Sequence, residues 1–198
     1  MKIKSIFLLI LLTVSVSSFS QSWSKSQLDE ANTAKDISYL TKNEKETIMY
    51  INLCRLFPKE FLLLEVNPYQ IDEEYGDSVL IEFREFKRSL KSDLLTRAPC
   101  QSLKFERALY RDAKCFSTEI SKNDRNPHER NRLKKNNYAE CISFGEETGK
   151  DIALQLLVDA GVASLGHTKN CLCKSFSKIG VSCNSHFEYE FFAVAEFQ

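Results

Sequence analysis

The chain changes its hydrophobic periodicity partway along its 198 residues, and this change restricts its fold class. Up to residue 120 the apolar side chains recur every three or four positions, which is the pattern of helices with one buried face. From residue 138 onward, runs rich in β-branched and aromatic residues predict strands around one further helix. Helices first and strands last predict an α+β chain, or an α/β/α stack, with a largely antiparallel sheet.

Local signals place the boundaries of these elements. Thr41-Lys42-Asn43-Glu44 is a capping box that begins a helix, and Pro58 ends that helix and starts a short second one. The breakers Asn67-Pro68 and Ala98-Pro99 separate the helices that follow. The expected elements are helices at 44–57, 59–65, 79–90 and 103–120, a loop at 123–137, a strand at 138–145, a buried helix at 148–158, a turn at 164–167, and strands at 178–183 and 188–197.

Composition excludes several classes of protein. A hydrophobic content of 43 % is too high for a disordered chain, and with only 6 Gly and 4 Pro a many-stranded β-sandwich is disfavoured. Basic and acidic side chains are equal at 27 each, so no charge excess is available for nucleic acid. We therefore expect no nucleic-acid partner.

The first twenty residues have the pattern of a signal peptide. Lys2 and Lys4 precede an apolar run at 6–16, and the small residues Ser17, Ser18 and Ser20 follow. The run is shorter than a bilayer-spanning helix requires, so the mature chain is expected to have no membrane span and to be periplasmic or secreted. Residues 21–40 are polar and without a clear period, and we expect a leader segment that lies over the surface or is partly disordered.

Export changes how the cysteines are interpreted, because disulfides persist in oxidising compartments. The seven cysteines leave two readings open, disulfide bonds or buried free thiols, and the odd number leaves at least one without a partner in the chain. Cys141 is expected inside the fold, either inert or bonded, with Cys183 as one candidate partner. The complete set is Cys54, Cys100, Cys115, Cys141, Cys171, Cys173 and Cys183.

Two histidines and two acidic residues are candidates for a functional site. His128 and His167 lie in expected loops, Glu140 lies on an expected strand, and Asp159 ends the helix that follows. If these four side chains converged, they would form a mixed nitrogen and oxygen site suited to Zn²⁺ or another divalent metal, with open positions for water.

Two segments around these residues resemble the CAP superfamily, also called the SCP domain, which comprises cysteine-rich secretory, antigen 5 and pathogenesis-related proteins. Ala139-Glu140-Cys141-Ile142 is similar to the family's G-E-N-I strand, and Gly166-His167 to its Gly-His turn. Tyr50 to Lys59 resembles the opening helix of the bacterial branch, and Lys178-Ile179-Gly180-Val181 its following strand. The resemblance assigns residues 41–198 to one CAP-like domain.

The resemblance implies a three-layer α-β-α sandwich with a mainly antiparallel central sheet and a cleft that holds the four candidate residues. On the positions that match, the cleft residues are His128, Glu140, Asp159 and His167, with His128 and His167 as metal ligands. Cys141 replaces an Asn of the family pattern, and Asp159 stands where the pattern has Glu, so the cleft is degenerate.

The function expected from the resemblance is an exported binding module whose cleft holds a divalent metal or a small or lipid-like ligand. One alternative is a metal-dependent hydrolase of peptide or ester bonds, in which metal-bound water or His167 attacks the substrate. A second alternative is an envelope structural protein with a relic cleft. Whether the chain is an enzyme stays open, and its partner is an unidentified small molecule, lipid or protein.

Overall fold

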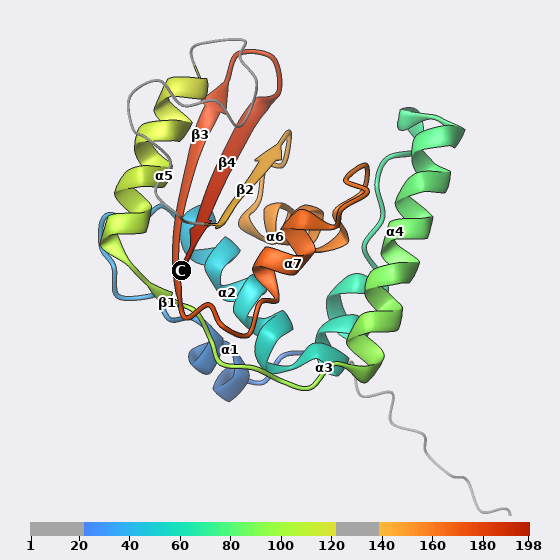
Figure 1. Cartoon of the computed structure of the whole chain (residues 1–198), viewed down its shortest axis with the longest axis horizontal. Helices are drawn as coiled ribbons and strands as arrows, with labels where there is room; N and C mark the ends of the chain where they lie inside the picture. Colours follow the sequence, from blue (N-terminus) through green and yellow to red (C-terminus); the bar gives the residue numbers. More distant parts are fainter. Residues whose placement is uncertain (1–21, 122–138) are drawn as a thin grey trace, which may run out of the picture.

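A computed structural model describes residues 22–121 and 139–198 (Figure 1). Within them, the chain is a mixed α/β protein with seven α-helices and a four-stranded mixed sheet. The expected signal peptide at 1–20 and the expected loop at 123–137, which includes His128, lie outside the described residues. No helix in the described part is both long and apolar enough to cross a membrane.

The helices follow the periodicity of the first 120 residues closely. The Thr41 capping box is formed, with the Glu44 N–H donating to Thr41 Oγ1 at 3.3 Å and the Thr41 N–H donating to Glu44 Oε2 at 2.7 Å. The α-helices are α1 (Lys25–Ala31), α2 (Lys42–Leu56), α3 (Pro58–Phe61), α4 (Asp77–Thr96), α5 (Arg107–Ile120), α6 (Gly149–Val158) and α7 (Gly166–Cys171). A π-helix, η1 (Leu62–Val66), and a 3₁₀ turn, η2 (Glu73–Tyr75), lie between α3 and α4.

The sheet has the strand order β1-β3-β4-β2. Strand β4 (Glu190–Phe197) pairs antiparallel with both β3 (Lys178–His186) and β2 (Ala139–Phe144). The two-residue strand β1 (Lys104–Phe105) pairs parallel with β3. The expected strands at 138–145, 178–183 and 188–197 are confirmed, whereas β1 lies where a helix was expected.

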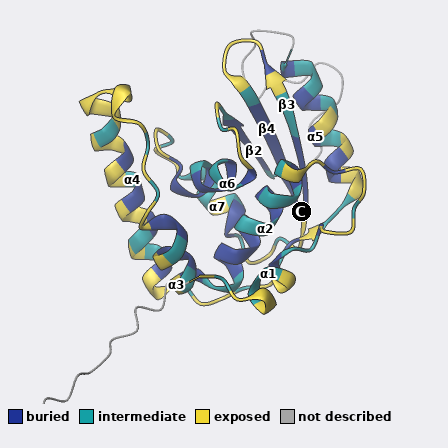
Figure 2. Ribbon diagram, turned by 180° about the vertical axis from the view of Figure 1, so that it is seen from behind, coloured by how far each residue is buried: buried dark blue, intermediate teal, exposed yellow. Residues whose placement is uncertain are grey.

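Helices cover both faces of the sheet (Figure 1). Helix α5 packs against β3 and β4 on one face, and α2, α6 and α7 lie on the other. Side chains therefore alternate along β2: Ile142 belongs to the apolar cluster with α5, whereas Cys141 belongs to the larger cluster with α2 and α6. Figure 2 shows buried residues concentrated on the strands and on α2 and α6, with α4 more exposed.

Residues 21–40 were expected to be a leader that lies over the surface or is partly disordered; the described part, 22–40, contains a helix and three buried side chains. Helix α1 begins with a capping box at Ser24, and Ala31 and Ala34 are fully buried. The side-chain amide of Asn52 on α2 donates to the Ala31 carbonyl oxygen at 3.0 Å. The segment is held by long-range contacts that a local sequence pattern does not contain.

Arg55 on α2 ties together segments far apart in sequence. Its side chain is fully buried, and its guanidinium donates to the carbonyl oxygens of Gln101, Cys171, Cys173 and Phe176 at 2.8 to 3.0 Å. Burial lowers the pKa of Arg55 from its ordinary value. These bonds anchor the chain after α7 to the start of the segment that leads into α5.

All seven cysteines lie within the described residues, and all are free thiols. The expectation of disulfide bonds is therefore not met, and the Cys141–Cys183 pair has a clear geometric obstacle. Strand β4 lies between β2 and β3, and Cys141 is opposite Ala195 whereas Cys183 is opposite Ala193, so the two cysteines are more than two strand spacings, about 9.6 Å, apart. A disulfide requires Cα atoms within about 7 Å. Cys141 is fully buried, as expected.

Candidate functional site

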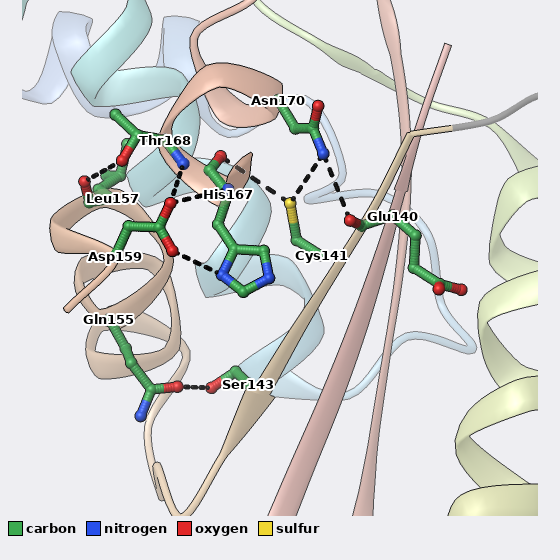
Figure 3. Close-up of polar contacts among 9 residues, drawn as sticks. All are labelled: Glu140, Cys141, Ser143, Gln155, Leu157, Asp159, His167, Thr168 and Asn170. Atoms are coloured by element: carbon green, nitrogen blue, oxygen red, sulfur yellow. Dashed lines mark hydrogen bonds and ion pairs between the residues drawn. The ribbon is translucent and has the colours of Figure 1, made fainter. Parts of the chain in front are cut away.

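Asp159 lies at the C-terminal end of α6, and its side chain contacts the beginning of α7. It adopts the left-handed conformation, with φ 59° and ψ 34°, which turns the chain back after α6. Its Oδ2 accepts hydrogen bonds from the backbone N–H groups of His167 at 2.9 Å and Thr168 at 3.2 Å, and its Oδ1 lies 2.9 Å from His167 Nδ1 (Figure 3). The carboxylate thus anchors both the first turn of α7 and the imidazole ring.

The contact with Asp159 determines how His167 is presented. A carboxylate can only accept, so it favours the tautomer with the proton on Nδ1 and leaves Nε2 as an acceptor. Thr168 Oγ1 donates to the Leu157 carbonyl oxygen at 2.9 Å and fixes the same corner. The sequence predicts a turn at 164–167. In the structure α7 already begins at Gly166, so the last two of these residues are helical.

Glu140 does not contact His167 in this arrangement. It shares a face of β2 with Ile142, and Figure 3 shows its carboxylate directed away from the imidazole. It lies opposite Glu196 in the sheet register, and both side chains are buried. Asp159, and not Glu140, is the carboxylate that orients His167.

The described residues do not assemble a metal centre. Of the four candidates, Asp159 and His167 lie together, Glu140 is on the opposite face, and His128 is outside the described residues. Asp159 Oδ2 already accepts two backbone N–H groups, and Oδ1 lies 2.9 Å from His167 Nδ1. In the ranges 22–121 and 139–198, no group of three or more His, Cys, Asp or Glu side chains could hold a metal ion.

Two candidate nucleophiles near this pair, Ser143 and Cys141, already have other contacts. Ser143 Oγ donates to Gln155 Oε1 at 2.6 Å, and Cys141 Sγ lies 3.9 Å from the His167 carbonyl oxygen (Figure 3). Burial raises the pKa of Cys141 well above its ordinary value, which disfavours the thiolate that a nucleophile requires. The pair has an oriented imidazole but, among the described contacts, no nucleophile to activate.

A cleft of about 630 Å³ lies beside α6, and the sequence did not point to it. One wall comes from the segment at 69–75 and α4, and the other from the end of β2 and from α6. Its lining residues are Tyr69, Gln70, Ile71, Asp72, Tyr75, Phe83, Phe144, Gly145, Glu146, Asp151, Gln155, Val158, Ala160 and Tyr189.

Glu146 is the central titratable group of this cleft. Gln155 Nε2 donates to Glu146 Oε1 and to the Phe144 carbonyl oxygen, both at 3.0 Å. Burial, with a smaller contribution from the negative charge of Asp151, raises the pKa of Glu146 to about 7. Gln155 also accepts from Ser143, so the amide is held from both ends and Glu146 has a fixed position.

Aromatic rings form much of the remaining wall. Phe144 packs against Tyr189 with ring centroids 5.1 Å apart, and Tyr69 packs edge-on against Phe83 at 5.5 Å. Tyr75 is 65 % exposed, and no aromatic ring among residues 22–121 and 139–198 packs on it. Burial, followed by the charges of Glu146 and Asp151, raises the pKa of Tyr69, and all three residues line the same cleft.

A smaller cavity of about 280 Å³ lies between α4 and α7. Its charged residues include Asp93 and Arg97, whose carboxylate and guanidinium lie 2.6 Å apart. These two charges already neutralise each other, whereas the carboxylates of the larger cleft have no cation in its lining. The larger cleft is therefore the better candidate for a ligand.

Comparison with models of known protein families gives no match for this chain, and comparison with curated proteins gives none. The assignment of a function therefore depends on the geometry described above.

The sequence contains a signal for the larger cleft, although a weak one. The segment at 69–75 has tyrosines at both ends and three acidic residues between them, directly after the Asn67-Pro68 break. Such a stretch is also typical of an exposed loop. The segment forms a cleft only together with Glu146 and Asp151, which lie more than 70 residues away in the sequence.

Proposed function

We propose that this chain is an exported, ligand-binding protein with a CAP-type α-β-α sandwich, and that the cleft beside α6 holds a small molecule. The observation that carries the proposal is the cleft itself: about 630 Å³, lined by five aromatic residues around a fixed carboxyl group of raised pKa. Small-molecule sites are typically concave, about 300 to 1,000 Å³ in volume, and largely aromatic with a few placed polar groups.

Binding fits these residues better than hydrolysis. His167 has an orienting carboxylate, but neither Ser143 nor Cys141 is presented to its Nε2 among the described contacts. The carboxylate contacts of Asp159 are also those needed to hold α7 in place, which is a structural role. A metal-dependent hydrolase would need ligands beyond those that the described residues bring together.

Export is supported by the sequence pattern at 1–20 alone. If the segment is a signal peptide, the protein recovered from its native compartment lacks these residues. N-terminal sequencing or intact-mass measurement checks this, and a mature protein that still begins at Met1 or Lys2 contradicts it.

The ligand site is tested by blocking the cleft. Ala160 lines it, and an Ala160→Trp variant fills part of its volume. Ala163 is also exposed but lies outside the cleft lining, so Ala163→Trp is the matched control. Ligand-observed NMR with a library of small fragments should show binding to wild type and Ala163→Trp, and loss of binding in Ala160→Trp. Equal binding to all three proteins, or no binding to any, contradicts the proposal.

A further inference from the structure

The cleft carries an unbalanced negative charge. Its lining contains three carboxyl groups, those of Asp72, Glu146 and Asp151, and includes neither lysine nor arginine. Of the lysines around it, Lys87 Nζ donates to the carbonyl oxygens of Asn67 and Tyr69 and lies 5.7 Å from the centroid of the Phe83 ring, and Lys150 Nζ lies 2.6 Å from a Glu65 carboxylate oxygen. A ligand with a positive charge would neutralise this wall.

The aromatic rings of the cleft also favour a positively charged ligand. The face of an aromatic ring is electron-rich and attracts a cation within about 6 Å of its centre. Five of the lining residues are Tyr or Phe, and Tyr75 and Tyr189 are exposed at the cleft. Rings and carboxylates together are the usual environment for an ammonium group bearing alkyl substituents.

The arrangement suits an organic cation better than a metal ion. Asp151 is engaged at the start of α6, where its carboxylate accepts from Thr148 Oγ1 at 2.5 Å, and Glu146 accepts from Gln155. The described residues contain no group of three side chains placed to ligate a metal ion. A metal ion needs several oxygens at about 2.0 to 2.6 Å, whereas an alkylammonium group needs only ring faces and a nearby negative charge.

We propose that the cleft binds an organic cation, a small molecule bearing a quaternary or tertiary ammonium group, with that group between the aromatic rings and Glu146. This inference rests on the proposed function, because it names the ligand class of the same cleft. Asp72 and Asp151 add to the attraction, and Gln155 keeps Glu146 in position.

Binding should depend on pH through Glu146. The negative form of Glu146 attracts the cation, so affinity should rise as pH increases through about 7. The other titratable groups around the cleft are Asp72, Asp151 and the hydroxyls of Tyr69, Tyr75 and Tyr189. His186 packs against Phe144 and Tyr189, and its Nδ1 accepts two backbone N–H groups. Comparison with Glu146→Gln isolates the contribution of Glu146, because all of these groups remain.

The test compares choline with 3,3-dimethylbutan-1-ol, which has nearly the same shape but no charge. Calorimetric titration of the full chain at pH 8 should give binding of choline about tenfold tighter than that of the neutral alcohol. Glu146→Gln should weaken choline binding about fivefold or more and remove most of its change between pH 6 and pH 8. Glu147→Gln makes the same charge change at an exposed neighbour outside the lining, and should bind as wild type does.

Each outcome separates this inference from the proposed function. If the neutral alcohol binds as tightly as choline and Ala160→Trp abolishes both, the cleft is a ligand site but its preference for cations is refuted. If Glu147→Gln weakens choline binding as much as Glu146→Gln, the attraction is a general effect of surface charge and the inference fails. If neither probe binds while library fragments do, the proposed function stands and the cation class is wrong. If nothing binds, both are wrong.

Discussion

Asp159 shows how one side chain can be essential to local structure without acting chemically. Its carboxylate is almost completely buried and receives two backbone N–H groups and the imidazole of His167. An Asp159→Asn variant keeps a side chain that tolerates the left-handed backbone but loses the charge and one acceptor. We expect the free energy of unfolding to fall by about 1.5 to 3 kcal/mol, as for buried hydrogen bonds to a charged group.

Urea denaturation measures this loss. The control is Asp36→Asn, because Asp36 is exposed, and it should change stability by less than about 0.5 kcal/mol. A similarly small effect at Asp159 would show that the contacts of the carboxylate are not required to hold α7.

Glu146 should also make stability depend on pH. Its raised pKa means that the folded chain holds the proton more tightly than the unfolded chain, for which the ordinary value is about 4.5. Stability should therefore fall as pH rises from about 4.5 to about 7, and then stay level with respect to this group. Glu146→Gln retains an oxygen acceptor for Gln155 and removes the buried charge. At pH 8 we expect it to be more stable than wild type by about 1 kcal/mol, after allowance for solvent screening.

Chemical denaturation at pH 4.5 and pH 8 tests this expectation, with Glu147→Gln as the matched control. A wild-type protein and a Glu146→Gln variant with the same change in stability between the two pH values would show that Glu146 titrates normally in the folded chain.

At the residue scale, the sequence located part of the candidate pair but not its geometry. Asp159 and His167 are both among the residues that the CAP resemblance selects, and they lie together. Glu140 was selected with them, but strand alternation places it on the face of β2 that α5 covers. The sequence of one strand predicts that its side chains alternate between two faces. It does not predict which helix covers each face, so the orientation of Glu140 could not be derived.

The close approach of β3 and α5 makes Gly180 the most demanding position between these elements. A Cβ atom there would lie 2.1 Å from Tyr110 N and 2.4 Å from the Leu109 carbonyl carbon, both of which are backbone atoms. Gly180→Ala must push α5 away from the sheet, and we expect the free energy of unfolding to fall by about 3 kcal/mol or more. Gly166→Ala is the control, because its Cβ would meet only Ser164 Oγ at 3.4 Å.

Thermal unfolding of the two alanine variants gives a direct comparison. Gly166→Ala should be neutral or slightly stabilising, since alanine is a better helix former than glycine. If Gly180→Ala melted at the wild-type temperature, the packing of α5 on β3 would have to be looser than the structure has it.

Elements with strong local signals were predictable, and elements held by distant contacts were not. The Thr41 capping box and the apolar pattern of α6 are encoded within a few residues, and both were expected. Helix α1 has only 7 residues; the capping box at Ser24 is a local signal for it, and a hydrogen bond from Trp23 Nε1 to Glu65 across 42 positions of sequence also holds it in place. Strand β1 has only 2 residues and exists because β3 lies beside it. Such elements are stabilised by tertiary packing, which a local pattern does not show.

For the whole molecule, the seven free thiols imply a clear order of reactivity. Cys54 and Cys141 are fully buried, and burial raises the pKa of each. Cys173 is partly exposed, and its contact with the Ser175 hydroxyl at 3.0 Å lowers its pKa. Alkylation of the folded protein with iodoacetamide should label Cys173 at least about tenfold faster than Cys54 or Cys141.

Mass spectrometry of tryptic peptides over a time course measures these rates. Complete unfolding in denaturant without reductant should make all seven thiols reactive, because the structure contains no disulfide among them. Fewer than seven alkylated cysteines in that experiment would mean that the protein, as isolated, carries a bond that this structure lacks.

The position of β4 in the sheet has a consequence for the time at which the chain can fold. β4 is hydrogen-bonded to both β2 and β3, yet it is the last of the four strands to leave the ribosome. Until Phe197 has been synthesised, β2 has no neighbouring strand and β3 can pair only with the two residues of β1. The sheet must therefore form after translation has passed this point, through contacts between distant parts of the chain, which form slowly.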